Sequence, residues 1–190
     1  KKFKFIKKKQ NILFEKFDVT FPEKIEKQYN YLKKKYGVPD IFINSSYPKT
    51  DDWNLNSFEK IKNKSFAKNL NIHLNSFSWL AKLVADSMVK SKKNGNIIQL
   101  SSIYGVVGQD LSIYLGTKMK ESMSYSIIKG GINNLTRQMA SYYGKYSIRV
   151  NAICPGGVSD VNQDKIFIKN YNRKVPLKRL AKNTEIASAI

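Results

Sequence analysis

The sequence predicts an α/β fold in which helices alternate with the strands of a parallel β-sheet. Three short apolar runs have the length of buried strands: Pro39–Asn44, Asn96–Ser102 and Ile148–Gly156. Each run ends in polar residues or in a Pro-Gly pair, which turns a strand into a loop. Longer stretches with helical character separate the runs, and this order of elements is typical of parallel sheets.

The stretches between the predicted strands contain the helices. Residues Phe21–Tyr36 form an amphipathic pattern that predicts a helix, with Gly37 as its end. Residues 57–89 predict one or two helices, with an expected break in the polar segment Asn69–Asn75. Residues Met123–Tyr143 predict a long helix, because its apolar side chains recur at helical spacing.

Length and composition place limits on the class of protein. A chain of 190 residues with 42% hydrophobic residues fits one globular domain. The single cysteine, Cys154, cannot form an internal disulfide, so a reducing compartment, the cytoplasm, is expected. No apolar run approaches the ~20 residues of a membrane-spanning helix, so we expect no membrane partner.

The formal net charge of +20 raises the possibility that the protein binds nucleic acid. The lysines are scattered along the chain, however, and arginine, the better side chain for reading bases, is rare. We therefore expect no specific nucleic-acid binding. A positive field of this size would still attract anionic substrates and phosphate-bearing cofactors.

Tyr125 and Lys129 form the most informative pair in the sequence. Residues four apart share one face of a helix, so the ammonium lies close to the phenol. A nearby positive charge stabilises a phenolate and lowers the pKa of the tyrosine, which would let it exchange a proton with a substrate oxygen. The spacing alone is common in a lysine-rich chain, so it needs support from other segments.

That support comes from the ends of the predicted strands. Asn44, Ser102 and Pro155-Gly156 each follow the apolar part of a strand. In open parallel sheets, ligands bind beyond the carboxyl ends of the strands. The sequence therefore predicts that these residues and the Tyr125 helix meet at one site.

The series of motifs resembles the classical short-chain dehydrogenase/reductase family. The matching segments follow in the family's order and span nearly all of residues 11–190: Asp18-Val19, Asn44-Ser-Ser-Tyr47, Ser101-Ser102, Tyr125 with Lys129, and Arg149–Gly156. The resemblance implies a Rossmann-like, doubly wound parallel sheet. It also implies an oxidoreductase that transfers a hydride between NAD or NADP and a carbonyl or secondary alcohol.

The resemblance assigns roles to the site residues. Tyr125 would donate the proton in reduction, Lys129 would lower its pKa and hold the nicotinamide ribose, and Ser102, rather than Ser101, would bind the substrate oxygen. On the cofactor side, the residues implied are Asp18 and Val19 at the adenine, Asn44 and Lys129 near the ribose, and Pro155, Gly156 and Val158 at the nicotinamide. No metal site is implied.

Two expected segments are missing from the sequence. The family opens with a strand and a Gly-rich turn that holds the pyrophosphate, but no such segment precedes Asp18. It also continues beyond the helix that begins near Thr184. We therefore interpret residues 1–190 as a single, partial domain whose sheet lacks its first and last strands and which is inactive alone. The alternative is a non-catalytic, degenerate scaffold or binding module.

Further differences from the family concern the substrate side. His73 falls where the family often has an asparagine, and Tyr47 replaces a usual glycine. The 22 residues Ile103–Ser124 exceed the family's common spacing, so we interpret them as a substrate-facing insertion. A small polar molecule such as a sugar derivative is the expected substrate. The resemblance also implies a homodimer or homotetramer, with subunit contacts through residues 74–89 and 123–143.

Overall fold

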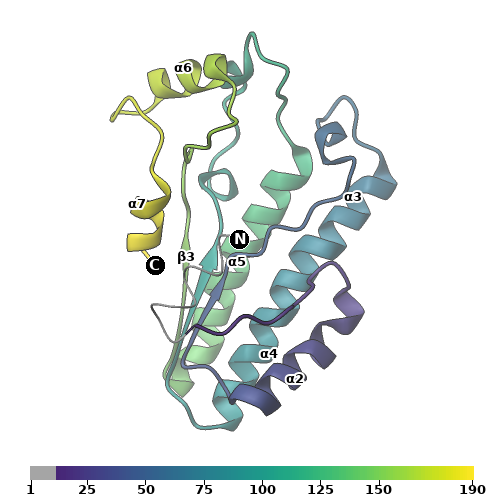
Figure 1. The fold of residues 1–190 in the computed structure, drawn as a ribbon, viewed down its shortest axis with the longest axis vertical. Coiled ribbons are helices and arrows are strands. Elements are labelled where there is room, and N and C mark those ends of the chain that lie inside the picture. The colour runs from purple at the N-terminus through teal and green to yellow at the C-terminus, as the bar shows by residue number, and fades with distance from the viewer. Residues whose placement is uncertain (1–11) are drawn as a thin grey trace.

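The structure is a computed structural model that describes residues 12–190. Its centre is a three-stranded parallel sheet with the strand order β1-β2-β3 (Figure 1). The strands are β1 (Ile41–Asn44), β2 (Gly95–Leu100) and β3 (Ile148–Ile153). In this register Ile41 lies opposite Asn96, and Gly95 lies opposite Ile148. Because the strands are parallel, their carboxyl ends lie along one edge of the sheet.

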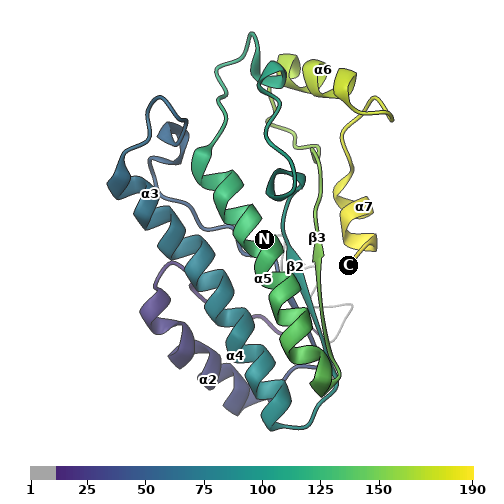
Figure 2. The same ribbon diagram turned by 180° about the vertical axis from the view of Figure 1, so that it is seen from behind.

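Helices flank the sheet. They are α2 (Ile25–Tyr36), α3 (Asn63–Asn69), α4 (Ser76–Lys90), α5 (Met123–Tyr143), α6 (Lys165–Lys174) and α7 (Asn183–Ser188). Shorter helical turns lie at Pro22–Lys24, Trp53–Leu55, Leu70–Asn75, Ile103–Gly105, Leu111–Tyr114 and Gly144–Tyr146. Figures 1 and 2 show α2, α4 and α5 side by side, while α6 and α7 lie across the strands from them.

The main core lies between the sheet and the helices α2, α4 and α5. Ile25 of α2, Met88 of α4 and Ile97 of β2 are all fully buried in it. On β1, by contrast, Ile41 and Ile43 remain 60% and 45% exposed. The helical layer therefore covers one face of the sheet and leaves part of β1 exposed, and it holds the start of α5 close to the carboxyl ends of the strands.

The structure confirms the predicted parallel α/β architecture. The three predicted strands form, and the helix predicted over Met123–Tyr143 has those bounds. Gly37 ends α2 with a φ of 84°, in the left-handed region that favours glycine.

One local expectation is wrong. The chain does not break at Asn69–Asn75, because a π-helical turn over Leu70–Asn75 joins α3 directly to α4. The polar side chains are accommodated within this turn, where Asn75 Nδ2 donates to Asn71 Oδ1 over 2.8 Å. Residues 12–17, before Asp18, form no strand.

Within residues 12–190, none of the helices combines the length and the apolar character that crossing a membrane would require.

Candidate active site

The first turns of α5 carry the tyrosine and the lysine. Helix α5 begins at Met123, and the hydroxyl of Ser122 caps it by accepting a hydrogen bond from the Tyr125 amide over 3.2 Å. Tyr125 and Lys129 then follow on one face, with Lys129 Nζ 5.7 Å from the centroid of the Tyr125 ring. Lys129 is only 5% exposed, so its charge acts in a largely dry environment.

Ser102 meets this pair from the end of β2. Its hydroxyl accepts a hydrogen bond from the Tyr104 amide over 3.2 Å and interacts with the Tyr125 phenol. The neighbouring Ser101 hydroxyl instead donates to the backbone carbonyl of Lys129 over 3.1 Å. Ser101 thus ties β2 to α5, while Ser102 is the serine beside the phenol, as the sequence predicts.

The pKa values in the pair differ from the expected pattern. Burial raises the pKa of the Tyr125 phenol, and the hydrogen bond with Ser102 opposes this only in part. Lys129 is not among the causes of this shift, and its ammonium donates to the carbonyl of Leu100 over 2.9 Å. Burial lowers the pKa of Lys129 itself to about 8, although the electrostatic interaction with Cys154 acts to raise it. The predicted lowering of the tyrosine pKa is therefore wrong for this arrangement of side chains.

Further aromatic rings surround Tyr125. The ring of Tyr47 lies edge-on 5.9 Å from that of Tyr125, and the ring of Tyr104 lies 6.4 Å away. Lys129 Nζ is 5.6 Å from the centroid of Tyr47, so the ammonium lies near the faces of two tyrosines. Burial raises the pKa of Tyr114 to about 12 and also raises that of Tyr47 and Tyr104. These phenols are therefore neutral hydroxyl groups at pH 7.

His73 lies behind this cluster, on the π-helical turn. It is fully buried, with its ring 5.2 Å from that of Tyr47. Neither ring nitrogen has a hydrogen-bond partner among residues 12–190. Burial, and secondarily the charge of Lys129, lower the pKa of His73 to about 3, so the imidazole is neutral at pH 7.

Gly105 allows the loop after β2 to approach α5 closely. A Cβ atom at this position would lie 2.5 Å from both the carbonyl carbon and the carbonyl oxygen of Lys129. Backbone atoms cannot rotate out of the way, so a larger residue would force the loop and the helix apart. The glycine therefore sets the distance between the Ser102 loop and Lys129.

Two of the residues assigned to the cofactor border a separate hollow of about 490 Å³. Val19 and Asn44 both line it, together with apolar side chains of α2 and α4. Asn44 is buried, and its Nδ2 donates to the carbonyl of Phe77 over 3.2 Å. Asp18 does not line the hollow, and its carboxylate accepts hydrogen bonds from Thr20.

The loop after β3 contacts the loop after β2, which carries Ser102. The carbonyl of Pro155 accepts from the amide of Ile103 over 3.0 Å, which joins this loop to the one after β2. A Cβ atom on Gly156 would lie 3.0 Å from the Tyr171 hydroxyl, so the backbone passes close to α6. The carbonyl of Val158 already accepts from Gln163 Nε2 over 2.8 Å. That carbonyl keeps a second lone pair, so the amide and the carbonyl of Val158 both remain candidates for the predicted main-chain contact.

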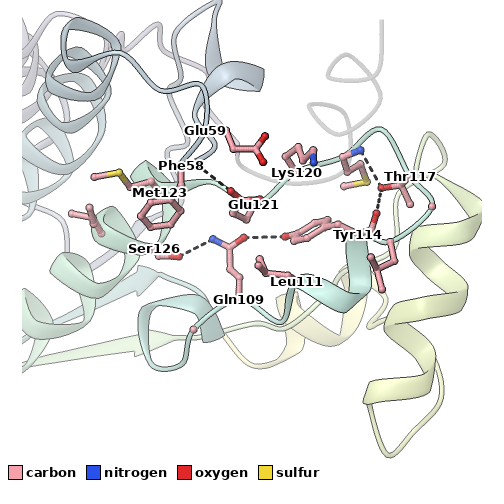
Figure 3. A pocket seen from close by; sticks show the side chains of 15 residues that line it. Phe58, Glu59, Gln109, Leu111, Tyr114, Thr117, Lys120, Glu121, Met123 and Ser126 are labelled. Atoms are coloured by element: carbon pink, nitrogen blue, oxygen red, sulfur yellow. Dashed lines mark hydrogen bonds between the residues drawn. The ribbon is translucent and has the colours of Figure 1, made fainter.

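The long loop between Ser102 and α5 supplies Gln109, a side chain that the sequence did not single out. The Tyr114 hydroxyl donates to Gln109 Oε1 over 3.0 Å, and Gln109 in turn bonds to Ser126 (Figure 3). The sequence signal was the abundance of tyrosine and glycine in an unusually long loop, which does not reveal individual partners. Within residues 12–190, no group of His, Cys, Asp or Glu side chains could hold a metal ion.

Comparisons with known proteins agree with this arrangement. The family model described as "Enoyl-(Acyl carrier protein) reductase" matches residues 3–190. A short-chain dehydrogenase from Leptospira borgpetersenii, solved with bound NAD+, superimposes with a TM-score of 0.79 and 30% identity over 91% of the chain. The chain belongs to the classical short-chain dehydrogenase/reductase family. Ser102, Tyr125 and Lys129 lie in this order along the chain and meet in space.

Two relatives illustrate the range within this family. "Post-translational flagellin modification protein A" of Campylobacter coli is 36% identical over 87% of the chain. "L-rhamnose-1-dehydrogenase" of Scheffersomyces stipitis is 28% identical over 93% of the chain. The chain spans 64% of the length of the Campylobacter protein, 65% of the Scheffersomyces protein and 64% of the Leptospira structure.

Proposed function

We propose that the protein transfers a hydride between NAD or NADP and a carbonyl or secondary alcohol group. The observation that carries this proposal is the convergence of the buried side chains of Ser102 and Lys129 with the half-buried Tyr125 at the carboxyl end of β2. The nicotinamide cofactor would supply or accept the hydride. The chain's own residues would bind the substrate oxygen and move its proton.

In the reducing direction, Tyr125 transfers its phenolic proton to the substrate oxygen as the carbonyl carbon gains a hydride. The Ser102 hydroxyl donates a hydrogen bond to the same oxygen while negative charge develops on it. Lys129, with a pKa of about 8, is mainly protonated at pH 7, so its charge stabilises the phenolate that remains. In the oxidising direction the phenolate takes the proton back from the alcohol.

The described residues fit two parts of the cofactor. The apolar hollow lined by Val19, with Asn44 at the end of β1, fits an adenine and its ribose, and Asp18 lies next to Val19. At the other end, Pro155, Gly156 and the Val158 amide fit the nicotinamide, and Lys129 fits its ribose hydroxyls.

We infer that the substrate is a small polar molecule, with a sugar derivative as the favoured class. Tyr47, Tyr104 and Tyr114 place neutral hydroxyl groups around Tyr125, and such groups donate to and accept from the hydroxyls of a sugar. The similarity to an L-rhamnose-1-dehydrogenase supports the same class. The long loop that carries Tyr104 and Tyr114 would face this substrate.

We further propose that residues 1–190 belong to one domain and that the protein acts as a cytoplasmic homo-oligomer. The outer surfaces of α4 and α5 expose Trp79, Ile127 and Tyr142, which a second copy of the chain would cover. Cys154 is the single cysteine of the sequence and cannot form a disulfide within it, which supports a reducing compartment.

The test of the proposed activity is a Tyr125→Phe substitution in the whole protein, assayed with NADH and NADPH against a panel of sugar aldehydes, ketones and alcohols. The ring and its packing remain, but the transferable proton is lost, so kcat should fall by about 10²- to 10⁴-fold. Tyr142→Phe, on the exposed side of the same helix, is the matched control and should retain full turnover. Turnover of Tyr125→Phe equal to that of the control would exclude the proposed mechanism, whereas absence of turnover in the wild-type protein across the panel would favour a non-catalytic module.

A further inference from the structure

The first turn of α5 is held by hydrogen bonds from two amide side chains that lie outside the helix. These are Gln109, from the long loop after β2, and Asn56, from the segment that follows β1. We propose that Gln109 and Asn56 are positioning residues that together fix the place of Tyr125. This inference rests on the proposed role of Tyr125 as the proton donor.

Gln109 uses both ends of its amide on the start of the helix. Its Nε2 donates to the carbonyl of Ser122 over 3.0 Å and to Ser126 Oγ over 2.8 Å (Figure 3). Its Oε1 accepts from the Tyr114 hydroxyl over 3.0 Å and from the amide of Ser122 over 3.4 Å. Ser122 is also the residue whose hydroxyl caps the amide of Tyr125. Gln109 therefore holds Ser122, the residue that caps the helical turn carrying Tyr125.

Packing alone does not hold this side of the helix. Gln109, Tyr114 and Ser126 line a hollow of about 830 Å³, in which Phe58 and Leu115 remain 71% and 69% exposed. Side chains beside an open hollow have few neighbours that resist a small displacement. The hydrogen bonds of Gln109 are therefore the main restraint on the helix start from this direction.

Asn56 holds the same turn from the segment before α3. Its carbonyl accepts from the amide of Met123 over 3.0 Å, and its Oδ1 accepts from the Ser124 hydroxyl over 2.6 Å. Its Nδ2 donates to Ser65 Oγ and to the carbonyl of Asp52, each over 3.2 Å. Asn56 and Ser124 are both almost completely buried, and a buried polar network whose members are paired is rigid.

These contacts fall on the three residues immediately before Tyr125 and on Ser126, which follows it. The first four amides of a helix have no partner within the helix, so outside groups decide where the first turn lies. Here Asn56 pairs the amide of Met123, and Ser122, itself held by Gln109, pairs that of Tyr125. Catalytic groups are sensitive to such placement, because a displacement of about 1 Å can cost about 10²-fold in rate.

The experiment measures kcat and KM for Gln109→Met and Ser124→Ala in the whole protein. Each variant keeps a side chain of similar or smaller size. Gln109→Met removes the hydrogen bonds of Gln109 to the helix start, and Ser124→Ala removes the hydrogen bond from Ser124 to Asn56 Oδ1. We expect kcat to fall by about 10- to 100-fold, while KM for the cofactor changes by less than about twofold. The controls are Gln138→Met, exposed on α5, and Ser87→Ala, which removes a similarly buried hydroxyl from α4.

A Gln109→Glu variant separates positioning from a general loss of stability. An ionised carboxylate accepts from Tyr114 but cannot donate to the carbonyl of Ser122, whereas a protonated carboxyl group can do both. The ratio of its kcat to the wild-type kcat should therefore rise as the pH falls toward the carboxyl pKa. A variant that is merely less stable would show no such recovery.

The same proteins give a second measurement that does not depend on activity. Amide hydrogen exchange at Met123 and Tyr125 should be about tenfold faster in Gln109→Met and Ser124→Ala than in the controls. If Tyr125→Phe is inactive but both variants keep kcat within twofold of wild type, the positioning role is excluded. If Tyr125→Phe remains active, the proposed function fails, and the exchange rates alone decide whether these amides hold the turn. Unchanged exchange at both residues excludes the restraint itself.

Discussion

Replacing Gly105 by alanine tests how closely the loop after β2 must approach α5. The new Cβ atom would lie 2.5 Å from the carbonyl carbon and oxygen of Lys129 and 2.6 Å from Asn133 Nδ2. An ordinary contact needs about 3.5 Å, so the loop or the helix must move by about 1 Å. Overpacking of this kind typically costs about 1–3 kcal/mol of folding free energy.

The assay is urea unfolding of wild type, Gly105→Ala and Gly108→Ala, followed by circular dichroism. Gly108 lies in the same loop, and a Cβ atom there would meet no atom within 4 Å, so it is a matched control. The control should be neutral or more stable by up to about 1 kcal/mol, since alanine restricts the unfolded chain. The free energy of unfolding of Gly105→Ala should be about 1–3 kcal/mol lower than that of wild type. Equal stability of the two variants would refute the argument from close approach.

Two further predictions concern buried titratable groups. Burial lowers the pKa of Lys129 to about 8, whereas a lysine in the unfolded chain titrates near ~10.4, so the unfolded chain binds more protons between these pH values. The wild-type melting temperature should therefore rise relative to that of Lys129→Met between about pH 8 and 10, and a constant difference would contradict the lowered pKa. His73 is the only histidine in the chain, and burial lowers its pKa to about 3. Its imidazole resonances in NMR spectra should stay constant from pH 8 to 5 in the folded protein. In urea they should titrate with a midpoint of about 6.5. A midpoint above pH 5 in the folded protein would contradict the lowered pKa and would show that water reaches the ring.

Local sequence patterns were enough to predict the main elements that carry the site. The positions of Asn44 and Ser102 at the ends of strands were predictable, because a short apolar run followed by polar residues is typical of a buried strand that leads into a loop. Helix α5 was predictable because its apolar side chains recur at helical spacing over 21 residues. The i,i+4 spacing then placed Lys129 beside Tyr125 without any knowledge of the fold.

Features that depend on contacts between distant segments could not be predicted. The π-helical turn that contains His73 packs against α5, and no local pattern distinguishes it from a break. The raised pKa of Tyr125 arises from burial and not from its neighbour in sequence, which is why the expected direction was wrong. The partners of Gln109 lie on another element, so its role became visible only in the structure.

The parallel register has a consequence for the order in which this site assembles during folding. Ile41 lies opposite Asn96, and Gly95 lies opposite Ile148, so each strand pair joins segments about 50 positions apart. The entropy of closing such long loops must be lost before the pairing contributes any stability, which makes folding slow. The Tyr125–Lys129 spacing exists as soon as α5 forms, whereas Asn44 and Ser102 reach it only after the sheet has closed. The proposed proton transfer should therefore be the last property that the refolding protein regains, well after its helical signal.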